Sequence, residues 1–192
     1  MRTVLFVLCL FVLTLVAQPM LAQEVKGFRS DLLGQIGYVQ KQILELEDSI
    51  PDKKMTWRPN KEVRSISEVY SHIAFTNYMF VKFAGVALPE GIVVNSEDDG
   101  MKWEKASTDK KIVREQLVKS FDFVKNAIGN MSDASLENMV DFFGQKMTVR
   151  GVLLVLLSHV HEHLGQSIAY ARMNGVVPPW TAREMAAAKA KK

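Results

Sequence analysis

Cysteine is nearly absent from this chain: Cys9 is the only one among 192 residues. It lies in an apolar run, residues 4–17, that follows a short positive start. The run is shorter than the roughly 20 residues of a membrane span. It predicts a secretory signal peptide over residues 1–22, cut after Ala22; an uncleaved membrane anchor is the alternative. The mature chain would then have no thiolate ligand and no cysteine nucleophile, and we expect an exported protein, periplasmic or secreted.

An excess of charge of one sign is also missing, with 24 basic against 21 acidic side chains. No basic stripe alternates with aromatic residues, so nothing indicates nucleic-acid binding. We also expect no stable membrane association once the signal is removed. The one local excess is the basic end, which we interpret as a solvated tail over residues 181–192. Strand-like alternation is absent too, apart from a short extended piece at residues 91–94, and this favours an all-α protein.

Four segments repeat apolar residues with helical periodicity. A capping box, Ser65 with Glu68, opens the second segment, Asp109 stands at the start of the third, and Thr148 precedes the fourth. Proline and glycine follow the segments, where a helix would have to stop. The predicted helices cover residues 30–49, 65–84, 107–130 and 149–174.

Four amphipathic helices of about 20 residues predict a four-helix bundle over residues 23–180. The connection of roughly 20 residues between the second and third helices, 85–106, exceeds the 2–8 residues usual between neighbours in a bundle. It is long enough to run back along the bundle, which favours a crossover over simple up-down order. Its polar stretch, residues 95–100, would then be a lid or a solvated turn.

The chain has four histidines, and three of them fall within five residues, at His159, His161 and His163. Residues four apart lie on one face of a helix, so His159 and His163 point the same way. His161 is two residues from each, roughly 200° around the helix, and faces away. The pair lies on the apolar stripe of its helix, and His72 lies on that of the second helix.

Three imidazoles directed at one core are costly unless they have partners, and a divalent cation is such a partner. Three neutral nitrogens with an open fourth position are typical of a catalytic zinc-type site. The metal ligands are therefore predicted to be His72, His159 and His163, with hydrogen-bonded core histidines as the alternative. His161 and Glu162 are not followed by the second histidine of an HExxH motif, so the site is not of that metalloprotease type.

At these residues the sequence resembles the DinB/YfiT-like family. The strongest match is the stretch from His159 to Gln166, and four others accompany it, at residues 55–59, 65–74, 147–151 and 174–180. The resemblance implies a four-helix bundle in up-down-down-up order, with a metal held by His72, His159 and His163. Relatives of this kind include transferases and isomerases that use bacillithiol or mycothiol, which are cytoplasmic thiols. A predicted export signal is a departure from that setting.

Two functions remain open from the sequence. The first is a hydrolase or thiol-type transferase that acts on a small molecule through a divalent ion, for which zinc or nickel is expected. The second is a non-catalytic exported protein that binds a metal or a small molecule. No second catalytic residue stands out. Gln166 and Tyr170 lie on the side of His163 and would orient a ligand or an imidazole, or be polar groups satisfied within the bundle. A homodimer is compatible with either function.

Overall fold

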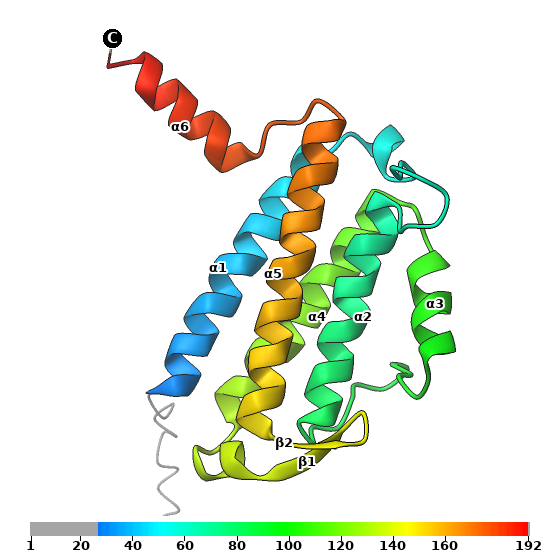
Figure 1. The fold of residues 1–192 in the computed structure, drawn as a ribbon, viewed down its shortest axis with the longest axis vertical. Coiled ribbons are helices and arrows are strands. Elements are labelled where there is room, and N and C mark those ends of the chain that lie inside the picture. The colour runs from blue at the N-terminus through cyan, green and yellow to red at the C-terminus, as the bar shows by residue number, and fades with distance from the viewer. Residues whose placement is uncertain (1–26, 192) are drawn as a thin grey trace, which may run out of the picture.

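The computed structural model describes residues 27–191, and the predicted signal peptide lies outside this range. Four long helices form a bundle, as the sequence predicts (Figure 1). α1 and α5 run in one direction, and α2 and α4 run in the other. The bounds of these helices are α1 Phe28–Ser49, α2 Ile66–Phe83, α4 Lys110–Asn130 and α5 Val149–Met173.

The bundle pairs helices that do not follow one another in the chain. α1 and α2 each pack against both α4 and α5, so α1 lies diagonally opposite α2. At one end, Lys110 of α4 donates to the carbonyls of Asp48 and Ile50, and at the other end Arg29 of α1 donates to the carbonyl of Gly129. The predicted crossover lies between α2 and α4. It lets these two helices lie side by side in the same direction, because a short turn between them would have made them antiparallel.

Local signals in the sequence fix where the core helices begin. The Ser65 hydroxyl accepts from the Glu68 backbone and the Glu68 carboxylate accepts from the Ser65 backbone, which completes the predicted capping box. The Asp109 and Thr148 side chains cap α4 and α5 in the same way. The apolar stripes then meet in one core, whose fully buried side chains include Ile36, Tyr70, Leu117 and Leu153.

The long connection contains a helix that the sequence analysis did not predict. α3, Glu97–Lys105, begins with a second capping box, formed by Ser96 and Asp99, and packs along α2. Gly100 permits this approach, because a Cβ there would lie 3.0 Å from the Phe75 ring. Residues 91–94, where the sequence suggests a short extended piece, lie in neither a strand nor a helix. The polar stretch 95–100 is therefore the start of a helix that crosses the outer face of α2.

A small β-hairpin was also missed. β1, Met139–Phe142, and β2, Gln145–Thr148, pair antiparallel and close the end of the bundle where α2 finishes (Figure 1). Strands of four residues are too short to show a clear alternation of polar and apolar residues. Two 3₁₀ turns complete the loops, Asp52–Lys54 before α2 and Ala134–Glu137 before β1.

The basic end of the chain, predicted to be a solvated tail, contains a helix. α6, Pro179–Lys189, extends away from the bundle, and all of its residues are at least partly exposed (Figure 1). A proline is tolerated at the first helical position, where its missing N–H needs no partner, so Pro179 begins a helix although it cannot continue one. Within the described part of the chain, no helix combines the length and the apolar character that crossing a membrane requires.

One buried ion pair joins α1 to α4. Glu47 of α1 is fully buried, and Arg114 of α4 donates to its carboxylate and to the carbonyl of Leu44. Burial raises the pKa of the Glu47 carboxyl, although the hydrogen bond and positive charge of Arg114 oppose that shift. The pair therefore ties the two helices together at the cost of placing a carboxylate in the core.

We expect Arg114→Met to lower the free energy of unfolding at pH 7 by about 2–3 kcal/mol, because it leaves the Glu47 carboxylate buried without its partner. The loss should shrink as the pH falls toward 5. Protonation is favoured in the folded state when the folded pKa is raised, so acid relieves the cost. Urea unfolding of both proteins at the two pH values measures this. Lys119→Met, which removes an exposed partner of Glu115 on the same helix, is the control and should change stability little. An equal loss at both pH values would contradict the assignment.

Candidate metal centre

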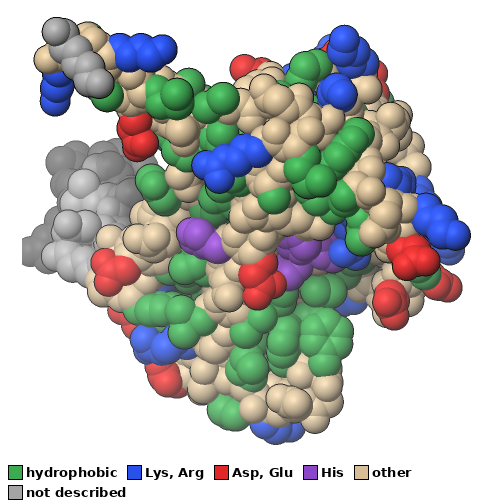
Figure 2. Space-filling model, turned by 45° about the horizontal axis from the view of Figure 1, so that its top comes forward, with side chains coloured by type: hydrophobic (Ala, Val, Ile, Leu, Met, Phe, Trp, Pro, Cys, Tyr) green, Lys and Arg blue, Asp and Glu red, His purple; other side chains and the backbone are tan. Residues whose placement is uncertain are grey.

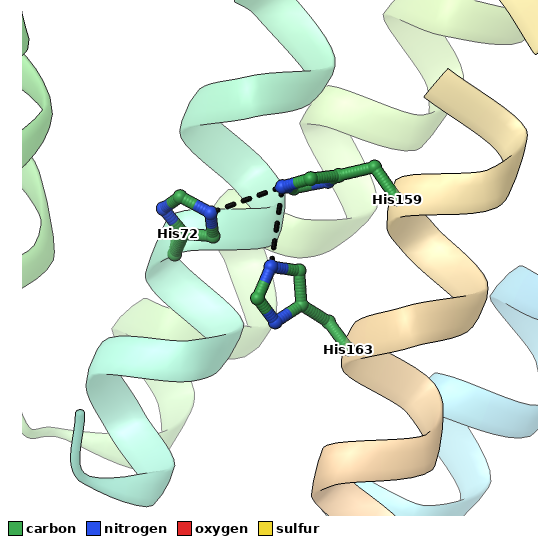
Figure 3. A group of neighbouring side chains, drawn as sticks. All are labelled: His72, His159 and His163. Atoms are coloured by element: carbon green, nitrogen blue, oxygen red, sulfur yellow. Dashed lines mark hydrogen bonds between the residues drawn. The ribbon is translucent and has the colours of Figure 1, made fainter. Parts of the chain in front are cut away.

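The three predicted histidines meet between α2 and α5 (Figure 3). His72 lies on α2, and His159 and His163 lie one turn apart on the facing side of α5. The Nε2 atom of His159 is 3.1 Å from Nε2 of His72 and 3.1 Å from Nε2 of His163. Zinc–nitrogen bonds of about 2.1 Å place neighbouring ligand nitrogens roughly 3–3.5 Å apart. The structure thus brings the three side chains to the spacing of a shared metal ion, as the helix phases predict.

The hydrogen-bond partners of the Nδ1 atoms show which nitrogen of each ring carries the proton. His72 Nδ1 is 2.7 Å from a Glu104 carboxylate oxygen, and His163 Nδ1 is 2.8 Å from the Gln166 side-chain oxygen. A carboxylate and an amide oxygen can only accept, so both Nδ1 atoms carry the proton. His159 Nδ1 faces the hydroxyl oxygen of Thr76 at 3.5 Å, and that hydroxyl donates to the His72 carbonyl. The Thr76 oxygen is therefore the acceptor for the Nδ1 proton of His159.

Three Nε2 lone pairs therefore point at one another. In that state the 3.1 Å contacts between nitrogens have no hydrogen to share, and only a cation between them would make the arrangement favourable. The donor set, three imidazole nitrogens, suits divalent transition-metal ions. The residues present fit a divalent metal ion, and His72, His159 and His163 would hold it.

The surroundings of His159 and His163 favour their neutral form. Burial lowers the pKa of His159 to about 3, and the neighbouring His163, His72 and Arg64 add to the shift. Burial also lowers the pKa of His163, against the hydrogen bond to Gln166. A neutral ring is the form that binds metal, so protons compete little for these two nitrogens near neutral pH.

Glu104 is the functional residue that sequence reasoning missed. It lies on α3, is 8% exposed, and accepts two hydrogen bonds from Arg64, at 2.7 and 3.0 Å, in addition to the one from His72. Burial alone would raise the pKa of Glu104, but the hydrogen bonds from His72 and Arg64 and the charge of Arg64 outweigh it and lower that pKa. An ionised carboxylate behind a ligand histidine fixes its tautomer and makes it a stronger ligand.

A second group of side chains orients His163. The Gln166 amide nitrogen donates to the Tyr170 hydroxyl at 3.1 Å while its oxygen accepts from His163, so Gln166 links the imidazole to Tyr170. Trp57 packs edge-on against the Tyr170 ring. Of the roles proposed for Gln166 and Tyr170, the structure thus supports orientation of an imidazole.

The remaining histidine and its neighbour lie outside the site. His161 and Glu162 are exposed, and His161 Nδ1 hydrogen-bonds to the Leu157 carbonyl one turn earlier on α5. This is the placement that helix phase predicts for His161. Arg58, from the Trp57-Arg58-Pro59 stretch, pairs with Glu68 in the capping box and does not reach the histidines.

A cavity of about 1,000 Å³ reaches the triad at His72, whereas His159 and His163 do not line it. His72, Thr76, Glu104 and Arg64 line its polar end, and the other walls are mainly apolar. Figure 2 shows histidine side chains reaching the surface next to a group of hydrophobic side chains. A small molecule therefore has access to the site.

We expect His72→Ala, His159→Ala and His163→Ala each to abolish stoichiometric metal binding, and His161→Ala to leave it unchanged. The first three remove one of the converging nitrogens, whereas His161 faces solvent. Elemental analysis of protein purified without a histidine tag measures bound metal per chain, and circular dichroism checks that each variant is folded. Equal loss from His161→Ala would show that the helix phase assigned to the site is wrong.

We expect Glu104→Gln to weaken metal affinity by about 10–100-fold, because the neutral amide still accepts a hydrogen bond from His72 but supplies no negative charge. Competition with a chelator of known affinity measures the change. Asp98→Asn, an exposed charge change on the same helix, is the control and should have no effect. If both variants bind metal as the wild type does, Glu104 only braces α3 through Arg64.

Comparison with known proteins supports both the fold and the family. A family model of the DinB superfamily matches residues 35–167, a range that includes all three histidines. No curated protein matches the chain.

Solved structures of low sequence identity share the fold. A DinB-like protein from Bacillus cereus is 18% identical, with a TM-score of 0.67 over 78% of this chain and 95% of its own. A conserved protein from Enterococcus faecalis is 12% identical, with a TM-score of 0.61 over 77% of this chain and 97% of its own. YfiT from Bacillus subtilis, described as "a probable metal-dependent hydrolase with an unusual four-helix bundle topology", is 12% identical, with a TM-score of 0.63 over 80% of this chain and 92% of its own. The family match covers well over half of the chain, which therefore belongs to the DinB superfamily.

Proposed function

We propose that this protein is an exported, metal-dependent hydrolase of a small molecule, with zinc or nickel held by His72, His159 and His163. One observation carries the proposal. The Nε2 atoms of His72 and His163 each lie 3.1 Å from Nε2 of His159, with their Nδ1 protons turned outward, and His72 lines a cavity large enough for a substrate.

A divalent ion held there would supply Lewis-acid chemistry, which polarises a carbonyl or phosphoryl oxygen. The chain's own residues prepare the position. Glu104 and Gln166 hold the Nδ1 protons of two ligands, so that the lone pairs cannot turn away. Arg64 keeps Glu104 ionised and contributes positive charge to the polar end of the cavity.

Hydrolysis is favoured over thiol transfer for two reasons. YfiT, which shares the fold, is described as a probable metal-dependent hydrolase. Export, predicted from residues 1–22, would separate the chain from cytoplasmic thiols.

Mass spectrometry of the mature N-terminus after expression with the native leader tests export. A chain that keeps residues 1–22 would overturn the cleaved signal.

The open cavity favours an enzyme over a purely structural metal site, because structural sites are closed. A non-catalytic exported protein that binds a metal or a small molecule is the second candidate. It would use the same three histidines and the same cavity, and it differs only in the absence of turnover.

We expect tag-free protein loaded with zinc or nickel to hydrolyse at least one class among ester, amide and phosphoester substrates. A strong chelator and His163→Ala should each remove the activity, while His161→Ala, the matched control on the same helix, should keep it. Initial rates with and without added metal measure this. Stoichiometric metal with no turnover on any class would overturn the hydrolase and support the non-catalytic protein.

A further inference from the structure

Phe143, at the tip of the β-hairpin, is unusual in its backbone conformation and in the exposure of its side chain. Phe143 and Gly144 form the two-residue turn between β1 and β2, with φ of 52° and 80°. A turn with positive φ at both positions favours Asn-Gly, and a phenylalanine there is strained. The Phe143 side chain is also 66% exposed, although it is large and apolar. Neither feature is explained by the stability of the hairpin.

Aromatic contacts hold the Phe143 ring in place. Its centroid lies 4.8 Å from the Phe83 ring of α2 and 4.8 Å from the Phe142 ring. Phe142 in turn stacks on Phe80, and the Phe80 ring lies edge-on to His159 at 5.3 Å. The hairpin tip is therefore connected through packed rings to the candidate metal centre.

The cavity runs between these two places. Phe75, Met79 and Phe83 follow His72 at intervals of three and four residues, so one face of α2 forms an apolar floor. Eleven residues of helix separate His72 from Phe83, a length of about 16 Å. Val94 and Met101 line the cavity from the α3 side, and the hairpin contributes Val140 and Phe143.

Polar groups around the far end of the cavity are already engaged. The Lys82 ammonium donates to the Val94 carbonyl and to the Asn95 side chain. Asp141 accepts from the Gly144 backbone within the turn. Two apolar side chains of the walls, Met101 and Phe143, are exposed, whereas Phe75 and Val94 are buried beneath the cavity. A large exposed apolar surface rimmed by polar residues is typical of a binding groove.

We propose that this cavity binds an extended apolar chain, such as the acyl or alkyl chain of an ester or amide, with the polar group of that molecule at His72. Phe143 is the residue that determines specificity for chain length, because it forms the apolar end of the cavity farthest from the triad. The reaction at the polar end rests on the proposed function, whereas the binding of the chain does not require the metal.

The test uses unreactive amides as probes. N-methyldecanamide and N-methylpropanamide carry the same polar group and differ only in the apolar chain. Isothermal titration with metal-loaded and with chelator-treated protein should give an affinity at least about tenfold higher for the longer amide, from the additional apolar surface buried. The preference should persist without metal, so it can fail independently of the hydrolase proposal. Equal affinity for the two amides would overturn the chain site.

Phe143→Asn separates binding from packing. Asparagine suits the turn, so the melting temperature should rise, while affinity for N-methyldecanamide should fall about tenfold as the apolar end is lost. A purely structural Phe143 would give the opposite result, a lower melting temperature with unchanged affinity, and would overturn its role in specificity.

A second pair of variants covers the case in which the hairpin rearranges. Met101→Ser removes an exposed apolar side chain from the cavity wall, and Ile112→Ser removes one of equal exposure, 46%, from α4 outside the cavity. Only Met101→Ser should weaken binding of N-methyldecanamide. Equal effects of the two substitutions would overturn the proposed location.

Discussion

The convergence of three imidazole lone pairs is the constraint on which the rest of this structure depends. It requires α2 and α5, which run in opposite directions, to lie side by side in one fixed register along their axes. A slip of either helix by a single residue would turn its histidines by roughly 100° and carry them off the shared position. Glu104 and Gln166 then fix the ring orientations, since each accepts the Nδ1 proton of one ligand. The site is therefore held by backbone register and by outer hydrogen bonds together.

The crossover between α2 and α4 serves both the bundle and the site. It places α1 diagonally opposite α2, and it leaves α3 free to lie along the outer face of α2. From there α3 supplies Glu104 to the back of His72 and Met101 to the wall of the cavity. A short turn would have given neither. The connection that crosses over between α2 and α4 thus builds one side of the candidate site.

Two residues of the structure, Glu47 and Phe143, are unfavourable for stability when taken by themselves. Glu47 is ionisable and fully buried, and Phe143 combines a strained backbone with an exposed apolar ring. Glu47 has a structural partner in Arg114, which joins α1 to α4. Phe143 packs on Phe83 and Phe142 but stays 66% exposed, and its position at the end of the cavity is the basis for assigning it to ligand binding.

The sequence by itself determined the four core helices, the caps that open three of them and the three histidines that meet at the candidate site. These features are local, because the period of an apolar stripe, a capping box and the i, i+4 spacing of two histidines are all read within a few turns of one helix. It did not reveal α3, the hairpin or α6. α3 and the hairpin are short, and α6 buries no face, so no apolar periodicity marked them. Only the tertiary structure placed Glu104 behind His72 and Phe143 at the end of the cavity. Each contact joins residues far apart in the chain, and its existence depends on how α3 and the hairpin dock on α2, which no local pattern encodes.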